Sequence, residues 1–197
     1  MTASDGTNST DQAVAITVTD ANDNSPVFTS GATVSVAENE TSVVYTAAAT
    51  DADAGTTLTY SLSGRDASLF TIDADTGEVS FVNAPDFENP SDAGGDNVYD
   101  IIVTASDGTN SVDQSVAITV TDVNDNNPVF SSGATASAAE NIATVVYTAA
   151  ATDADAGTTL TYSLSGTDAS LFTIDADTGE VSSVSYTHLT LPTICSV

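Results

Sequence analysis

The sequence almost lacks basic residues. It has no Lys, one Arg and one His against 28 acidic residues among 197, so its formal net charge is −27. A surface of this sign repels phosphate groups, which excludes nucleic acid as a partner and disfavours binding to an anionic membrane surface. The carboxylates therefore require neutralisation, either by salt or by a divalent cation.

Several other features are also missing. The chain has no Trp, and its single Cys lies within the last three residues, so no internal disulfide is expected. It has no run of 18 apolar residues that would predict a transmembrane helix, and no basic segment followed by an apolar stretch that would predict a signal peptide. A catalytic Ser–His or Cys–His pair is absent before residue 183, which disfavours nucleophilic catalysis.

What the chain does contain is a repeat with a period of 102 residues. Sliding Thr2–Ser80 onto Thr104–Ser182 leaves 68 of 79 positions identical. A period of about 100 residues has the size of a domain rather than that of a solenoid turn. Met1 takes the place of Val103 within a strand pattern, so we expect a fragment of a longer array or an internal start.

Short segments rich in β-branched and aromatic residues recur between Gly, Asp, Asn and Pro. Residues 99–105 and 116–120 alternate apolar and polar side chains, which predicts one face in a core and the other in water. A helical period is absent. Seven strands in about 100 residues predict an all-β fold, namely a seven-stranded Greek-key β-sandwich repeated in tandem. The predicted strands are 32–37, 42–50, 57–62, 68–72, 78–82, 98–105 and 112–121.

The second copy of the repeat breaks off after Ser182. The residues that follow contain the only His and the only Cys, His188 and Cys195, and could suggest a metal or catalytic site. However, Val184–Thr193 (VSYTHLTLPT) resembles the translation of a sequencing-library adapter. We therefore expect residues 183–197 to be non-native and assign no function to them.

Aspartate dominates the acidic residues, with 22 Asp against six Glu, which is typical of turns and oxygen-ligand loops rather than of helices. Four acidic motifs occur at fixed places in the repeat. They are Ala-Glu-Asn at 37–39 and 139–141, Asp-Phe-Glu at 86–88, Asp-x-Asn-Asp-Asn at 20–24 and 122–126, and Asp-Ala-Asp at 51–53 and 153–155, to which Asp107 can be added.

In tandem sandwiches these motifs can converge at the junction between two domains. Around residues 122–126 such a convergence would gather seven carboxylates, those of Glu38, Asp86, Glu88, Asp122, Asp125, Asp153 and Asp155. Like charges a few ångströms apart repel by roughly 1 kcal/mol per pair even in water. All-oxygen ligands suit Ca²⁺, which takes about six to eight of them, so two or three Ca²⁺ ions would nearly cancel the charge.

Turn formation alone is the competing explanation for so much Asp and Asn. A single Asp-Ala-Asp or Asp-Gly fits a turn, and Asp-Ala-Asp-Thr-Gly at 73–77 and 175–179 is typical of a connection between strands. The Asp-x-Asn-Asp-Asn run, in contrast, has more oxygen-bearing side chains than one turn needs. An EF-hand loop is excluded, because position twelve of the two candidate stretches is Leu62 or Gly133 rather than Glu.

The motifs AEN, DAD, FTIDADTGEV, DFE, YDIIVTASDG and DVNDNNPVF follow one another within one period. This ordered set resembles a cadherin repeat, and especially the Asp-rich cadherin-like arrays of bacterial surface proteins. The resemblance covers Met1–Ser182. It implies the last strand and linker of a truncated repeat at 1–23, a complete repeat at 24–126, the first part of a third repeat at 127–182, and the tail at 183–197.

The resemblance also implies Ca²⁺ as the bound cofactor at the junctions. For the junction at 122–126 the implied ligands are Glu38, Asp86, Glu88 and Asp125 at the upstream ions, Asp155 as a bridge, and Asn124, Asn126 and Asp153 at the third ion, with Asp122 and the Val123 carbonyl alongside. For the other junction they are Asn22, Asp23, Asn24, Asp51, Asp53 and Asp107.

The implied function is a calcium-dependent adhesion and structural module whose bound ions stiffen an extracellular rod. Its partners would be other cell-surface proteins or copies of itself, and a membrane anchor would lie in other parts of the parent protein. The alternatives are an acidic, salt-adapted spacer without specific ion sites and a non-catalytic repeat of a large secreted enzyme. A glycosidase pair of Asp86 and Glu88 is disfavoured, because two positions in one turn cannot flank opposite faces of a sugar ring.

Overall fold

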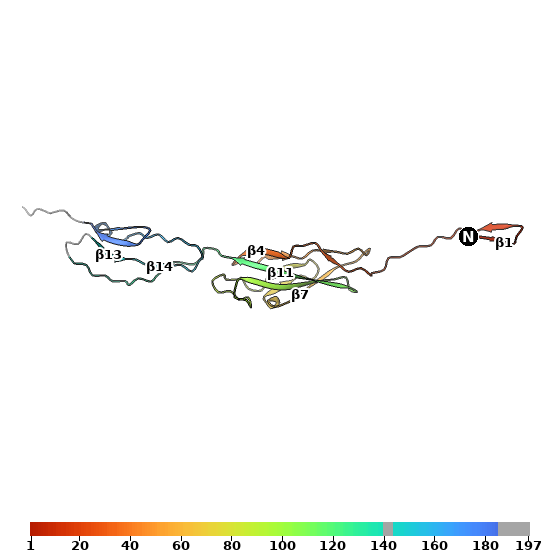
Figure 1. The fold of residues 1–197 in the computed structure, drawn as a ribbon, viewed down its shortest axis with the longest axis horizontal. Coiled ribbons are helices and arrows are strands. Elements are labelled where there is room, and N and C mark those ends of the chain that lie inside the picture. The colour runs from red at the N-terminus through yellow and green to blue at the C-terminus, as the bar shows by residue number, and fades with distance from the viewer. Residues whose placement is uncertain (140–143, 185–197) are drawn as a thin grey trace, which may run out of the picture. The chain divides into compact units, whose positions relative to one another are not determined.

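The computed structural model describes residues 1–139 and 144–184. The chain divides into two compact units, unit 1 (Met1–Thr121) and unit 2 (Asp122–Val197). Strands account for nearly all of the regular structure, as Figure 1 shows. The predicted repeat boundaries at residues 23, 126 and 182 stay predictions.

One sheet of unit 1 has four strands in the order β4–β11–β10–β7. The long antiparallel hairpin of β10 (Val98–Ser106) and β11 (Ser111–Thr121) forms its centre. On the outer sides, β7 (Thr59–Ser63) pairs antiparallel with β10, whereas β4 (Thr33–Ala37) pairs parallel with β11. The outer strands β4 and β7 pair only with this hairpin within the sheet, so both depend on it for their backbone hydrogen bonds there.

The opposite layer contains β5 (Val43–Thr46), β8 (Phe70–Ile72) and β9 (Glu78–Phe81), with β9 in the middle. A separate short pair joins β3 (Val27–Phe28) to β6 (Ala49–Thr50). One turn of 3₁₀-helix, η1 (Ala67–Leu69), leads into β8.

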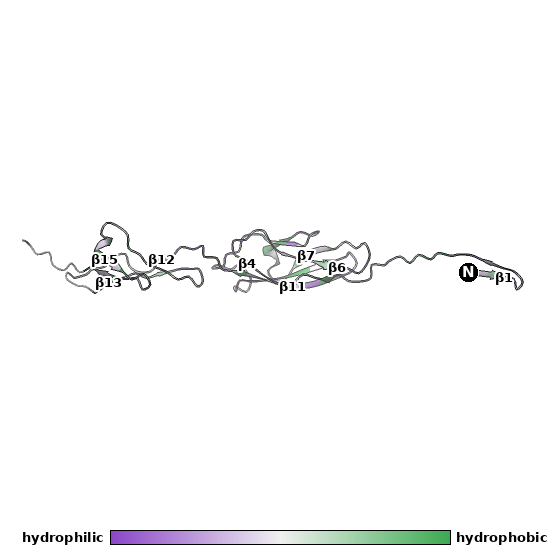
Figure 2. Ribbon diagram, turned by 90° about the horizontal axis from the view of Figure 1, so that it is seen from above, coloured by the Kyte–Doolittle hydropathy of each residue, from purple (hydrophilic) through white to green (hydrophobic). Residues whose placement is uncertain are grey.

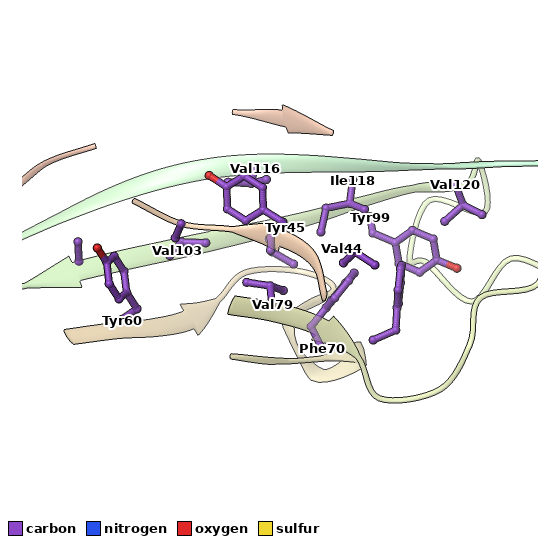
Figure 3. Packing of buried hydrophobic residues seen from close by; sticks show 14 residues of the cluster. Val44, Tyr45, Tyr60, Phe70, Val79, Tyr99, Val103, Val116, Ile118 and Val120 are labelled. Carbon is purple, nitrogen blue, oxygen red and sulfur yellow. The ribbon is translucent and has the colours of Figure 1, made fainter. Parts of the chain in front are cut away.

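The core of unit 1 lies between these two layers. Alternate residues of β10 and β11 point inward, and Tyr99, Val103 and Ile118 are each 0% exposed. Figure 3 shows them facing Phe70 and Val79 of the opposite layer. In addition, the rings of Phe81 and Tyr99 meet edge to face at 5.2 Å. Figure 2 shows hydrophobic stretches, in green, among the strands of unit 1. The structure thus confirms the predicted all-β sandwich and the predicted inward faces.

Two strand predictions were wrong in detail. Of the predicted strand 68–72, residues 68 and 69 belong to the 3₁₀-helix η1, and only 70–72 form β8. The predicted strand 42–50 is two strands, because β5 pairs with β9 while β6 pairs with β3. The change of partner occurs at Ala47, whose N–H donates to the carbonyl of Gly77 at 2.9 Å. Gly77 has φ of +72°, and a Cβ at this position would lie 2.4 Å from the Ala47 carbonyl oxygen. A glycine is therefore required where the chain leaves one sheet for the other.

The first copy of the β11 sequence behaves differently from β11 itself. β1 (Thr2–Ser4) and β2 (Ser9–Asp11) form a hairpin, and the chain after it is not a strand. Val18 is 90% exposed, whereas Val120, its counterpart in the repeat, is 1% exposed. The same sequence is buried only where neighbouring strands pair with it, because strand formation depends on the surrounding strands.

Unit 2 repeats only part of the sandwich. β12 (Val129–Phe130) pairs with β14 (Ala151–Thr152), and β13 (Val145–Thr148), β15 (Phe172–Ile174) and β16 (Glu180–Ser183) form a three-stranded sheet, with η2 (Ala169–Leu171) before β15. Residues 135–139 and 161–165, the counterparts of β4 and β7, are not strands. The described part of unit 2 contains no counterpart of the β10–β11 hairpin that would pair with them.

Candidate metal centre

The best-defined acidic site lies wholly within unit 1. Asp51 and Asp53 follow β6, and Asp107 is in the turn between β10 and β11. One carboxylate oxygen from each of the three residues lies within 4.8 Å of the others. Since the turn and the loop are brought to the same end of the sandwich by the β-strands, residues 51–53 and 107 meet despite their separation in sequence.

Local hydrogen bonds fix the position of each carboxylate. Asp51 Oδ1 accepts from the backbone N–H of Asp53 at 2.8 Å, an arrangement typical of an Asx turn. Asp107 Oδ1 accepts from the backbone N–H groups of Thr109 and Asn110 at 2.7 and 2.6 Å. These bonds lower the pKa of Asp107, the Asn110 N–H having the largest effect. Asp107 is thus held in its charged form, ready to be a ligand.

The Asp-x-Asn-Asp-Asn motif before β3 joins this site. Asn24 donates to Asp53 through both its backbone N–H, at 2.8 Å, and its side-chain amide, at 2.5 Å. These bonds lower the pKa of Asp53, although burial and the nearby charge of Asp107 work against them. Asp53 is buried, so its charge is held away from bulk water.

One feature of the site favours a cation among the carboxylates, and a second is compatible with one. Asp51 Oδ2 is buried and has no hydrogen-bond partner, which costs free energy for a charged oxygen. In addition, the end of the Asn22 amide that faces the site lies 2.8 Å from Asp107 Oδ2 and 3.2 Å from Asp53 Oδ2.

The Asn22 geometry fits two explanations, which differ in which atom of the amide faces the site. An amide nitrogen at that end donates hydrogen bonds to both carboxylates, whereas an oxygen there needs a cation between itself and them. Separations of about 3 Å are those expected between neighbouring oxygens around Ca²⁺, whose oxygen ligands lie at about 2.3–2.6 Å. The donor set fits Ca²⁺ in kind, since every side chain offers oxygen and none offers sulfur or imidazole.

Sequence reasoning missed two residues that support this site. Asp20 Oδ2 accepts from the backbone N–H of Ala54 at 2.5 Å, which ties the start of the motif to the Asp-Ala-Asp loop. The side-chain amide of Asn110 donates to the carbonyl of Asn24 at 2.7 Å. Asp-Gly-Thr-Asn occurs at both copies of the turn, so the fixed position of this Asn was a signal that could have been used.

The opposite end of unit 1 holds the predicted ligands of the second junction. Glu38 follows the last residue of β4, is only 4% exposed, and its Oε2 accepts from the backbone N–H of Phe87 at 2.7 Å. This bond ties it to the Asp-Phe-Glu turn, where one carboxylate oxygen of Glu88 lies within 4.8 Å of one of Glu38. Asp86 instead accepts from the N–H of Asn89 at 2.9 Å within its own turn, and it is not in this group.

Unit 2 repeats the arrangement of the first site. Asn126 donates to Asp155 from its backbone N–H at 3.1 Å and from its side-chain amide at 2.8 Å, and one oxygen of Asp125 lies within 4.8 Å of one of Asp155. Burial works to raise the pKa of Asp155, but the bonds from Asn126 outweigh it and lower the pKa. Asp153 Oδ1 accepts from the N–H of Asp155 at 2.9 Å, just as Asp51 does from Asp53.

The remaining predicted residues have less defined places. Asn124 lines a small pocket together with Asp153, Val123 is exposed, and Asp122 Oδ1 is a buried oxygen without a hydrogen-bond partner. Asp23 Oδ1 accepts from the side-chain amide of Asn24 at 3.1 Å and is not in the group of Asp51, Asp53 and Asp107. The seven-carboxylate cluster around 122–126 stays a prediction.

Comparison with known proteins bears directly on this repeat. The profile described as the cadherin domain matches residues 32–121, the stretch from β4 to the end of β11. Residues 32–121 are a cadherin domain. The chain is 38% identical to Protocadherin Fat 1 of Homo sapiens over 184 residues, which is 85% of this chain but 4% of that protein. It is 37% identical over 182 residues to Cadherin EGF LAG seven-pass G-type receptor 1 of Mus musculus, covering 88% of this chain and 6% of that protein.

Solved structures give the same result for the fold. Mouse cadherin-23 EC22-24 superposes with a TM-score of 0.63 at 32% identity, over 83% of this chain and 55% of that chain. Human protocadherin-24 EC1-2 gives a TM-score of 0.68 at 27% identity, over 80% of this chain and 76% of that chain. The all-β fold of the chain is that of cadherin repeats. The chain spans only a small part of the length of the curated relatives that it matches.

In the part of the chain that the structure describes, no helix has the length and hydropathy to span a bilayer.

Proposed function

We propose that the chain is part of a calcium-dependent adhesion array in which Ca²⁺ binds at the ends of cadherin repeats and stiffens them into an extracellular rod. The observation that carries the proposal is the group of Asp51, Asp53 and Asp107, within which Asp51 Oδ2 is buried without a hydrogen-bond partner. Three carboxylates within 4.8 Å of one another repel, so this end of the domain needs a cation.

Most of the predicted ligands at this end of unit 1 have a defined task in this proposal. The carboxylates of the site would bind the ion directly, Asn22 would add its amide oxygen, and Asn24 orients Asp53. Bound Ca²⁺ supplies the charge that offsets their repulsion. Because residues 20–24 precede the domain and residues 51–53 and 107 belong to it, an ion shared by them would fix the linker against the domain.

A salt-adapted spacer without ion sites is the main alternative. A spacer should place its carboxylates apart, in water, where repulsion is weakest. Asp53 and Glu38 are instead 7% and 4% exposed, and the arrangement of the first site recurs at Asp155 in unit 2. Two copies of the same arrangement favour specific sites.

Thermal unfolding in calcium and in chelator tests the proposal at constant ionic strength. Extracellular calcium modules bind with dissociation constants of roughly 10⁻⁴–10⁻³ M, so calcium at about 10 mM should stabilise unit 1 by about 1.4–2.7 kcal/mol. We expect the melting temperature to rise by roughly 5–15 °C. Sodium chloride of equal ionic strength should have little effect.

A charge-matched variant makes the test specific to the site. Asp53→Asn should remove most of the calcium response, whereas Asp100→Asn, on the exposed face of β10, should retain it. If calcium and sodium chloride raise the melting temperature equally, or if both variants respond alike, the chain is an acidic spacer and the proposal fails.

A further inference from the structure

Residues 82–97 join β9 to β10 and carry the Asp-Phe-Glu turn at 86–88. This stretch, all of which the structure describes, contains no helix and no strand. Loops of this length without regular structure are uncommon in compact domains and tend either to have a function or to lack a fixed order. Here two buried carboxylates give the loop a fixed order, since Asp66 and Asp92 are only 2% and 6% exposed.

The two carboxylates bind the backbone of the loop and of the strand that follows it. Asp66 accepts from the N–H of Ala93 through Oδ1 and from the N–H of Asp100 through Oδ2, each at 2.8 Å, which joins the loop to β10. Asp92 accepts from the N–H of Asn97 at 3.1 Å. Backbone donors therefore satisfy both carboxylates, and both hold the end of the loop against the domain.

Asn97 is the last residue of the loop and has three defined contacts. Its N–H donates to Asp92, its carbonyl accepts from the N–H of Val120 at 2.9 Å, and its side-chain amide donates to the carbonyl of Phe87 at 2.9 Å. Its φ is +62°, in the left-handed region, where a side chain other than that of Gly is strained.

A second residue with the same strain bonds to the same turn. Asn39 has φ of +63°, and its N–H donates to the carbonyl of Pro85 at 2.9 Å. Within the described ranges, Asn39 and Asn97 are the only residues other than Gly that have a positive φ. Both bond to the stretch 85–87, so the strained backbone of this domain converges on the Asp-Phe-Glu turn. Strain collected at one place indicates a constraint set by function.

The constraint fixes the peptide groups on both sides of Phe87. Its N–H donates to Glu38 Oε2 at 2.7 Å, and its carbonyl, which belongs to the peptide bond leading into Glu88, accepts from Asn97. Its ring packs against the core of unit 1. The turn cannot rotate about Phe87 without breaking one of these contacts, so the direction in which the Glu88 side chain leaves the backbone is set.

We propose that Asn97 is a positioning residue for the predicted calcium ligands Glu38 and Glu88, and that Asp92 holds Asn97 in the conformation that this task requires. The inference rests on the proposed function, which gives the two glutamates their role at the ion. Asn97 acts through the peptide groups of Phe87. The loop thereby sets the separation of the two carboxylates before an ion arrives.

Electrostatic repulsion explains why such positioning is needed. One carboxylate oxygen of Glu88 lies within 4.8 Å of one of Glu38, and like charges at this separation repel. A turn that was free to move would swing Glu88 away whenever no ion was bound. Calcium would then have to restore the arrangement, and its affinity would fall by the cost of that ordering. A fixed turn avoids the cost.

Asn97→Gly isolates the side chain from the backbone. Gly adopts a positive φ without strain, so the variant keeps the backbone bonds to Asp92 and Val120 and loses only the amide that holds Phe87. Asn83→Gly is the matched control. It makes the same substitution in the same loop, at an exposed residue that takes part in none of these hydrogen bonds.

Calcium titration of the full chain reads the two ends of unit 1 separately, because the group of Asp51, Asp53 and Asp107 contains no Glu. With ¹³C in the Glu carboxyl groups, Asn97→Gly should raise the calcium midpoint of the Glu38 and Glu88 signals about tenfold. The midpoint of the Asn22 side-chain amide, at the other end, should not change. Asn97→Gly midpoints equal to those of the wild type, or an equal loss at both ends, would overturn the inference.

Amide hydrogen exchange in chelator tests the positioning without any ion. The N–H of Phe87 should exchange about tenfold faster in Asn97→Gly than in the wild type and at the wild-type rate in Asn83→Gly. An unchanged rate in Asn97→Gly would overturn the inference. Glu38 and Glu88 signals that ignore calcium in the wild type would instead contradict the proposed function, so the two failures are distinguishable.

A double-mutant cycle tests the part given to Asp92. Asp92→Asn alone should also speed the exchange of the Phe87 N–H in chelator, because Asn97 loses the partner of its backbone N–H. In the Asn97→Gly background it should add little, since both substitutions act through the same amide. An effect of Asp92→Asn that is as large in that background as in the wild type would contradict the role of Asp92.

Discussion

Asp51→Asn should raise the stability of unit 1 without calcium and should reduce the stabilisation that calcium provides. The substitution keeps the Oδ1 atom that accepts from Asp53 N–H, but it replaces the buried Oδ2 by an amide nitrogen. It therefore removes one negative charge and turns an oxygen without a hydrogen-bond partner into a donor beside two carboxylates.

The magnitude follows from the distances in the site. At separations up to 4.8 Å, each of the two carboxylate pairs that include Asp51 repels by about 1 kcal/mol in a water-like dielectric. In chelator, Asp51→Asn should thus raise the free energy of unfolding by about 1–2 kcal/mol, or the melting temperature by roughly 4–10 °C. In calcium it loses a charged ligand, and a tenfold weaker affinity lowers the calcium stabilisation by about 1.4 kcal/mol.

Circular dichroism melts of the wild type and the variant, each in calcium and in chelator, measure this difference. The expected pattern is a variant that is more stable than the wild type in chelator and that gains less from calcium. A variant that is less stable than the wild type in chelator, with an unchanged gain from calcium, would refute the reasoning. Asp100→Asn again controls for the change in net charge.

Three further predictions follow from the packing and the turns. Ile118→Ala should lower the free energy of unfolding by about 2–4 kcal/mol in denaturant titration, whereas Ile16→Ala should leave it unchanged, because only the first side chain is buried. Gly77→Ala should lower the free energy of unfolding by more than about 2 kcal/mol, since the new Cβ would lie 2.4 Å from a backbone oxygen. Gly95→Ala should lower it by about 1 kcal/mol, because Gly95 has a similar positive φ but open space around it. Burial works to raise the pKa of Asp92, but hydrogen bonds from backbone N–H groups of its own loop outweigh it and lower the pKa. The stability that Asp92 contributes is therefore present above its unfolded pKa of about 3.9 and is lost as the pH falls through its lower folded pKa. Melts between pH 2 and 6 should therefore fall less steeply for Asp92→Asn than for the wild type.

The sequence predicted most of the sandwich because one repeat contains all the neighbours that its strands need. Alternation over residues 99–105 and 116–120 correctly indicated their buried face. The break at Ala47 was not predictable from the run of residues 42–50, since it depends on which strands lie on either side. For the same reason the pattern could not show that residues 14–19 and 135–139 stay outside any strand.

The sequence predicted an acidic site with oxygen ligands, but it predicted only some of the residues that form the site. The resemblance to a cadherin repeat implied that Asp51, Asp53 and Asp107 share a junction, and in the structure one carboxylate oxygen from each lies within 4.8 Å of the others. The sequence could not show that Asp86 accepts a hydrogen bond from within its own turn, because this bond depends on the direction of one side chain. The supporting bond from Asn110 to the Asn24 carbonyl joins residues far apart in sequence, and only the fold brings them together.

A crystal structure of the chain grown in calcium would test the central claim most directly. The account predicts anomalous density from an ion at about 2.3–2.6 Å from oxygens of Asp51, Asp53 and Asp107, with the Asn22 amide oxygen also turned toward it. Ordered density without an ion, and with the Asn22 amide nitrogen donating to Asp107 and Asp53, would contradict the account.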